Sequence, residues 1–129
     1  MARILLDTHA FLWWIAGDKR LSTKARKAIA DESNEIFVSA VSAWEISTKI
    51  RIGKLVAPAL AGNGVTRAIA SQGFQSLGIS VDHGERAGSL SLAHRDPFDR
   101  MLVAQAQADG MAIVSNEMIF DECGVTRIW

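Results

Sequence analysis

The sequence predicts an α/β protein: a three-layer α/β/α sandwich in which helices cover both faces of a central, mainly parallel sheet of four to five strands. Short, continuously apolar runs recur along the chain, and such runs are typical of strands buried on both faces of a parallel sheet. Helical patterns separate these runs, and strands that alternate with helices form parallel sheets. With 129 residues, 49% of them hydrophobic, the chain has the size of one domain, which we assign to residues 1–129.

The expected elements alternate in order along the chain. The expected strands cover residues 4–6, 36–38, 77–81 (the weakest), 112–114 and a short last segment near 126–129. The expected helices cover residues 21–31, 40–52, 65–72, 83–93 and 97–109, with a loop at 58–64. The last helix is the clearest, because Pro97 suits a first helical position and Gly110 suits a helix end.

Composition and charge exclude several classes of protein. Lys and Arg number 14 and Asp and Glu also 14, so no bulk charge indicates a nucleic-acid or membrane partner. Cys123 is the single cysteine, which excludes a disulfide within the chain and a cysteine-based zinc cluster. The longest apolar stretch, residues 10–16, is far shorter than the roughly 20 residues that span a bilayer. With no recognisable secretory signal either, we expect a cytoplasmic protein without membrane contact.

Polar side chains follow the predicted strands where each strand ends. Asp7 follows the first strand, Ser39 the second and Ser115 the fourth. Ligands of open parallel sheets bind at the carboxyl ends of the strands, where these side chains converge. The adjoining helices and loops add four carboxylates: Glu45, Asp96, Asp99 and Glu117.

Carboxylates gathered in one place raise each other's pKa values or require a cation. A hard divalent ion with oxygen ligands, Mg²⁺ or Mn²⁺, is the natural occupant of such a site. That ion can lower the pKa of a bound water and hold a phosphodiester for in-line attack. Three basic residues near the predicted site could steer a phosphate backbone towards it: Lys49, Arg95 and Arg100.

Several of these residues also have a simpler structural interpretation. Asp7 could cap the following helix, and Glu45 could be a surface residue paired with Lys49 at i,i+4. Asp96 precedes Pro97, so it is expected to be mainly an N-cap. Asp99 could simply interact favourably with the dipole of its helix. Ser39 and Ser115 could be strand-end caps only, and Glu117 could be an ordinary acidic residue in a loop.

The three histidines give little support for a metal or base arrangement. His9 follows Asp7 closely enough in the chain to touch a substrate. His83 and His94 have no partner at ligand spacing, so we expect surface or supporting roles for them. The absence of a G-x-G-x-x-G or Walker A pattern disfavours a dinucleotide or nucleoside triphosphate site.

Four segments together carry a family resemblance that covers essentially the whole chain. They are residues 4–9 (ILLDTH), 38–46 (VSAVSAWEI), 94–106 (HRDPFDRMLVAQA) and 113–117 (IVSNE), the last followed by Gly124, Val125 and Trp129. In this order they resemble PIN-domain nucleases, particularly the VapC-type toxins of bacterial toxin–antitoxin pairs. The resemblance implies a metal-dependent endoribonuclease in which an acidic quartet binds Mg²⁺ or Mn²⁺.

The resemblance assigns roles to particular residues. Asp7, Glu45 and Asp99 match the first three acids of the quartet, which hold the metal, and Asp96 belongs to an Asp-Pro-Phe-Asp-Arg variant of the third motif. The fourth acid is usually an Asp two residues after a Thr or Ser, whereas here Glu117 follows Ser115. The resemblance also implies an RNA substrate of the tRNA or rRNA class, a homodimer, and a cognate antitoxin whose C-terminal segment covers the acidic cleft.

Two other functions are compatible with these residues. A catalytically weak PIN-like module that binds RNA or a protein is favoured by Glu117 and by the absent net positive charge. A phospho-acceptor domain would use Asp7 as a nucleophile. Haloacid-type phosphatases, however, carry a second Asp two residues later, where this chain has His9.

Overall fold

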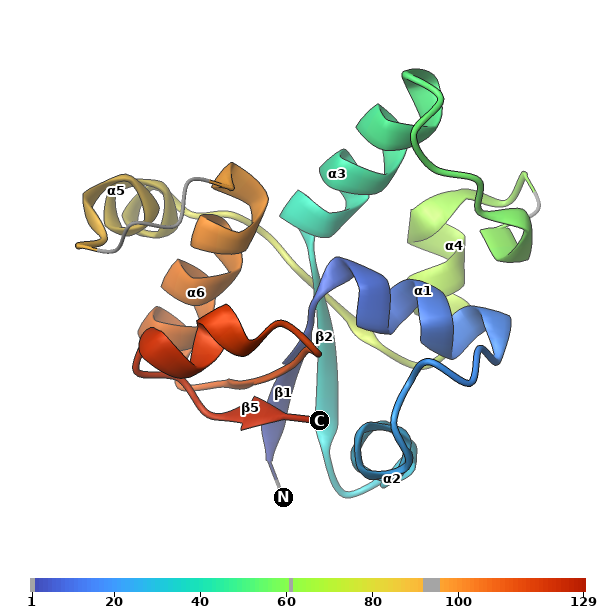
Figure 1. Ribbon diagram of the computed structural model, residues 1–129, viewed down its shortest axis with the longest axis horizontal. Coiled ribbons are helices and arrows are strands. Elements are labelled where there is room, and N and C mark those ends of the chain that lie inside the picture. Colours follow the sequence, from blue (N-terminus) through green and yellow to red (C-terminus); the bar gives the residue numbers. More distant parts are fainter. Residues whose placement is uncertain (1, 61, 92–95) are drawn as a thin grey trace.

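The structure, a computed structural model, describes residues 2–60, 62–91 and 96–129. Over these residues the chain forms a wholly parallel five-stranded sheet with the strand order β3-β2-β1-β4-β5 (Figure 1). In chain order the strands are β1 (Arg3–Leu6), β2 (Glu35–Ser39), β3 (Gln75–Leu77), β4 (Ala112–Val114) and β5 (Arg127–Ile128). The predicted α/β sandwich is confirmed, with the first strand at the centre of the sheet.

Helices cover both faces of the sheet. They are α1 (Thr8–Ala16), α2 (Thr23–Ala30), α3 (Ala40–Arg51), α4 (Gly64–Ser71), α5 (Val81–Ser89) and α6 (Pro97–Asp109), with short 3₁₀ helices η1 (Pro58–Leu60) and η2 (Met118–Glu122). In Figure 1, α1, α2 and α4 lie on one side of β1 and β2, whereas α6 lies on the other side with α5 outside it. None of the described helices is long and apolar enough to cross a bilayer.

The core has two halves because successive side chains of a strand point to opposite faces of the sheet. Ile4 and Leu6 pack on one face with Phe11 of α1, whereas Leu5 packs on the other face with Leu102 of α6. All five side chains are at most 1% exposed. Full burial of each contributes about 1.5–3 kcal/mol, which fixes β1 between the two helical layers.

The third strand differs from its prediction. The apolar run at 77–81 indicated a strand, but β3 covers residues 75–77 and α5 already begins at Val81. Ser80 caps α5: its hydroxyl accepts from the backbone N–H of His83, whose Nδ1 accepts from the N–H of Ser80. Of the surface or supporting roles expected for His83, the structure excludes the surface position, because His83 is a buried capping residue; Val81 is 91% exposed.

Asp96 is the N-cap of α6, in agreement with its structural interpretation. Its Oδ1 accepts from the backbone N–H groups of Phe98 at 2.9 Å and Asp99 at 3.2 Å. Pro97 occupies the first turn, where its missing N–H would have no helical partner. The helix ends at Gly110, whose φ of 64° lies in the left-handed region that glycine adopts without strain.

We expect the Asp96→Ala variant to lose about 1 kcal/mol of unfolding free energy, because alanine removes the acceptor that holds the first turn of α6. The Asp96→Asn variant keeps an acceptor oxygen and should retain the stability of the parent protein. Urea denaturation of the three proteins measures this difference. An equal loss in the Asn variant would contradict a role that depends on capping.

Candidate active site

Asp7 is fixed at the carboxyl end of the central strand by three hydrogen bonds. Its backbone N–H donates to the carbonyl of Val114 at 3.1 Å, which extends the pairing of β1 with β4. Its Oδ1 accepts from the N–H of Ala10 at 2.8 Å, so Asp7 caps α1 as its structural interpretation expected. The Ser115 hydroxyl, at the end of β4, also donates to the carboxylate. The side chain is held firmly and is 4% exposed.

Burial raises the pKa of the Asp7 carboxyl from 3.8 to about 6. This net value includes the hydrogen bonds from Ser115 and Ala10 and the charge of His9, which lower the pKa, and the negative charge of Asp99, which raises it. The ionised carboxylate is therefore costly at neutral pH unless a cation offsets its charge. The charge of Asp99, in the first turn of α6, thus acts on Asp7, the N-cap of α1.

Glu45 of α3 is also buried, at 5% exposed, but both of its oxygens have partners. Its Oε1 accepts from the Thr8 hydroxyl at 2.6 Å, and the Ser42 hydroxyl lies 3.0 Å from that of Thr8. Its Oε2 pairs with Nζ of Lys49 at 2.5 Å, one helical turn further along α3. The i,i+4 pair expected from the sequence is present, although Glu45 is not the surface residue of that interpretation.

Lys49 lies among the acidic residues. The pKa of its ammonium is raised, first by the hydrogen bond with Glu45 and then by the charges of Glu45, Asp96 and Asp99. Three predicted site residues, Glu45 of α3 and Asp96 and Asp99 at the start of α6, thus act on this lysine, and the charge of Asp99 also acts on Asp7. We refer to Asp7, Glu45, Asp96 and Asp99 as the acidic cluster.

Other predicted residues stand apart from this arrangement. Glu117 is exposed in the loop after β4, where its backbone N–H donates to the Ser115 hydroxyl. Arg100 donates to the carbonyls of Ala87 and Leu90 and so binds the end of α5, an arrangement that favours a structural role.

Arg95 and His94 lie outside the described residues. Among the described residues, no three His, Cys, Asp or Glu side chains gather closely enough to form a metal site by themselves.

The sequence indicated Ser39 as a strand-end cap, which the structure confirms, but it did not reveal the other polar groups that support this edge. Ser39 caps α3 through Val41, and its hydroxyl also donates to Oε1 of Gln105 at 2.6 Å. Gln105 is fully buried and donates to the carbonyl of Gly78. Its signal was an amide side chain, one of two in α6, that follows the apolar residues at positions 101–104. Thr8, which binds Glu45, and Ser42, whose hydroxyl lies beside that of Thr8, were marked only by their spacing. Thr8 follows Asp7, and Ser42 lies three residues before Glu45.

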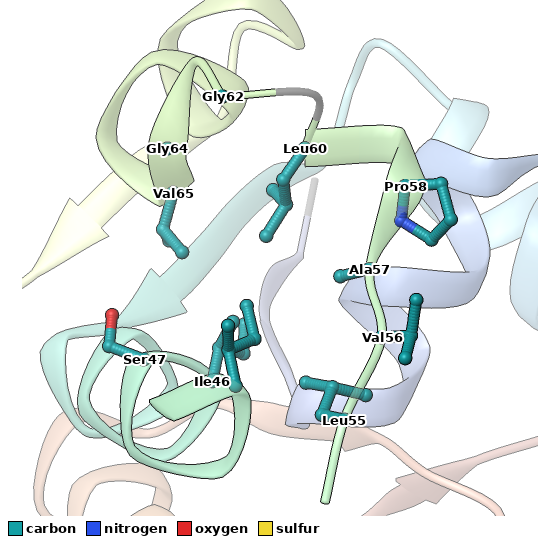
Figure 2. Close-up of a pocket in the computed structure, with 11 residues that line it drawn as sticks. Ile46, Ser47, Leu55, Val56, Ala57, Pro58, Leu60, Gly62, Gly64 and Val65 are labelled. Carbon is teal, nitrogen blue, oxygen red and sulfur yellow. The ribbon is translucent and has the colours of Figure 1, made fainter. Parts of the chain in front are cut away.

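An apolar groove of about 580 Å³ lies beside α3 (Figure 2). Ile46 of α3 forms its floor, and Leu60 and Val65 point into it from the opposite side. The segment Leu55–Pro58 forms another wall, on which Val56 is 85% exposed. The groove therefore leaves apolar side chains accessible to solvent.

The fold and site define a parallel α/β protein with carboxylates at the carboxyl edge of its sheet. Residues 4–124 match the PIN domain family. The chain is 31% identical over 121 residues to Ribonuclease VapC22 of Mycobacterium tuberculosis, with 91% of this chain and 88% of that protein covered. The chain therefore belongs to the PIN-domain family.

Solved structures share the fold at lower sequence identity. The VapBC2 complex of Rickettsia felis bound to promoter DNA matches with a TM-score of 0.70 and 15% identity, covering 97% of this chain and 96% of the matched chain. A toxin–antitoxin complex from Klebsiella pneumoniae matches at 0.61 and 20% identity over 89% and 87% of the two chains. VapC20 of M. tuberculosis, a toxin that cleaves the sarcin-ricin loop, matches at 0.62 and 17% identity over 95% and 96%.

The raised pKa of Asp7 makes stability depend on pH. The folded protein binds the proton of the Asp7 carboxyl more tightly than the unfolded chain does. The stability that this protonation contributes is therefore fully present below pH ~4 and is lost as the pH rises through about 6. In metal-free buffer, the Asp7→Asn variant should therefore be more stable than the parent protein at pH 7.5, by about 1–3 kcal/mol, with asparagine still able to cap α1. The difference should largely disappear at pH 4.

Urea denaturation at the two pH values, with EDTA present, measures this effect. The Glu32→Gln variant is a matched control, because Glu32 is exposed in the turn before β2, at the opposite edge of the sheet. A stability gain in Asp7→Asn that is the same at both pH values would contradict the electrostatic explanation.

Proposed function

We propose that this chain is a metal-dependent endoribonuclease that acts as the toxin of a toxin–antitoxin pair. Membership of the PIN-domain family and the similarity to Ribonuclease VapC22 support the activity on RNA. The observation that carries the proposal is the buried Asp7 carboxylate, whose pKa is raised to about 6 beside Asp99 at the carboxyl edge of the sheet. A buried carboxylate of this kind is a recurrent feature of active sites.

The donor chemistry of this edge fits Mg²⁺ or Mn²⁺. Mg²⁺ is usually held by one or two carboxylates together with water and substrate phosphates, so Asp7 and Asp99 suffice as protein ligands. Glu45 is the third carboxylate at this edge, and Glu117 is an exposed candidate for a supporting position. When bound, such an ion activates water and stabilises negative charge on the phosphate.

The chain's own residues prepare the site for this chemistry. Ser115 and Ala10 hold the Asp7 carboxylate in one orientation, so little rearrangement is needed on binding. Thr8 holds Glu45, and Glu45 in turn keeps the Lys49 ammonium beside the acidic cluster. That ammonium is suited to contact a substrate phosphate oxygen.

We also propose the partners of this enzyme. The related complexes from R. felis and K. pneumoniae contain a toxin with its antitoxin, which supports an antitoxin as a partner of this chain. The groove beside α3 is apolar and exposed, so we expect an apolar antitoxin segment to cover it. A homodimer, a structured substrate of the tRNA or rRNA class and a cytoplasmic location complete the proposal.

A catalytically weak binding module is the second candidate function. The pairing of Glu45 with Lys49 favours it, because this carboxylate is already neutralised and contributes little to a metal site in the described state. Cleavage of RNA by the purified protein separates the two candidates.

We expect the partner-free protein to cleave total RNA into discrete fragments with Mg²⁺ or Mn²⁺ but not with EDTA. The Asp7→Asn and Asp99→Asn variants should lose at least about 100-fold in cleavage rate, because each removes a carboxylate from the proposed metal site. Glu32→Gln should cleave like the parent protein. A fully active Asp7→Asn protein would disprove the site, and folded parent protein without cleavage in either metal would favour the binding module.

We expect Val56→Asp to prevent neutralisation by the cognate antitoxin, because it places a charge on the apolar wall of the groove. RNA cleavage by the isolated variant should be unchanged, since Val56 lies outside the acidic cluster. The experiment compares growth of cells that express each toxin with the antitoxin, alongside co-purification of the pair. Continued neutralisation and complex formation would show that the antitoxin does not need this groove.

A further inference from the structure

Lys49 differs from an ordinary surface lysine in the groups that surround it. Its ammonium pairs with a carboxylate that is nearly fully buried, whereas its own side chain is 34% exposed. The charges of Asp96 and Asp99, which lie on a different helix, also stabilise its protonated form. The ammonium is therefore placed where carboxylates from α3 and α6 meet.

Glu45 has no oxygen left without a partner in this arrangement. Thr8 donates to Oε1 and Lys49 to Oε2, so the carboxylate is both hydrogen-bonded and neutralised. Asp7, by contrast, receives hydrogen bonds from neutral groups, and the charges of His9 and Asp99 act on it in opposite directions. Among the described residues, Glu45 thus has a directly bonded counter-ion, whereas Asp7 has none.

We propose that Lys49 is the resident cation of the acidic cluster: by neutralising Glu45 it restricts metal binding to Asp7 and Asp99 and lowers the affinity for divalent ions. Glu45 then acts by positioning Lys49 and does not ligate the metal. A divalent ion approaching Asp7 and Asp99 is repelled by the ammonium and gains no third carboxylate. This inference rests on the proposed metal site but not on RNA cleavage.

The test measures Mn²⁺ binding to the full-length protein without RNA, by calorimetry or by the electron paramagnetic resonance of free Mn²⁺. Lys49→Met removes the positive charge and releases Glu45, so the affinity should rise about tenfold or more. Glu45→Gln leaves Lys49 free to pair with Asp99, so the affinity should fall. The double variant Lys49→Met/Glu45→Gln removes the pair and should bind Mn²⁺ within about threefold of the parent protein.

Two controls separate this role from a general effect of charge or stability. Lys24→Met removes an exposed lysine of α2 and should leave Mn²⁺ affinity unchanged. Lys49→Arg retains the cation and should bind like the parent protein. Thermal unfolding in EDTA confirms that each variant is folded at the temperature of the titration.

The outcomes distinguish this inference from the proposed function. If the parent protein binds Mn²⁺ and Lys49→Met binds it equally or more weakly, Lys49 does not control the site and the inference is overturned alone. The inference is also overturned if the double variant loses affinity as strongly as Glu45→Gln, because Glu45 would then be a ligand. Binding gained by Lys49→Met when the parent protein shows none supports the inference but contradicts the proposed metal dependence. Absence of binding in both proteins overturns both proposals.

Discussion

The candidate site depends on one physical constraint: it costs free energy to keep the buried Asp7 carboxylate ionised. Asp7 ends the central strand, and its backbone is paired with β4 while its side chain caps α1. The side chain is only 4% exposed, so water solvates the carboxylate poorly. In the function that we propose, a bound cation balances this charge.

A second buried carboxylate at the same edge differs from Asp7 because it has a counter-ion within the protein. Glu45 has a built-in counter-ion one turn along its own helix, so its negative charge is already satisfied. The difference follows from secondary structure: α3 offers an i,i+4 neighbour, whereas Asp7 lies at a junction between a strand and a helix. The local fold around each acid therefore decides its chemistry as much as the type of side chain.

The features that follow from local sequence were predictable. The apolar runs predicted β1, β2 and β4, and Asp96, Pro97 and Gly110 predicted the limits of α6. An edge strand such as β3 has polar, exposed residues, so the more apolar run after it was misleading. The expected helices did not include α1, because nearly all of its residues are apolar and such a segment shows no helical periodicity.

The candidate site was less completely predictable, because burial and pairing depend on elements that are distant in the sequence. The chain order indicated that Asp7, Glu45 and Asp99 belong to one edge of the sheet. It did not indicate that Thr8 would bind Glu45 across 37 positions or that Gln105 would be buried against Ser39. The i,i+4 spacing predicted the pairing of Lys49 with Glu45, but not the effect of Asp96 and Asp99, whose charges act on Lys49 only in the folded protein.

The outer strands of the sheet have a consequence for how this protein can associate. β3 has three residues and β5 has two, so each exposes only a short row of backbone donors and acceptors. A strand from another chain would find too few partners there to extend the sheet, which protects the protein against edge-to-edge aggregation. Stable assemblies must then be built from side-chain contacts on the helical layers, where recognition is set by shape and charge and is specific to one partner.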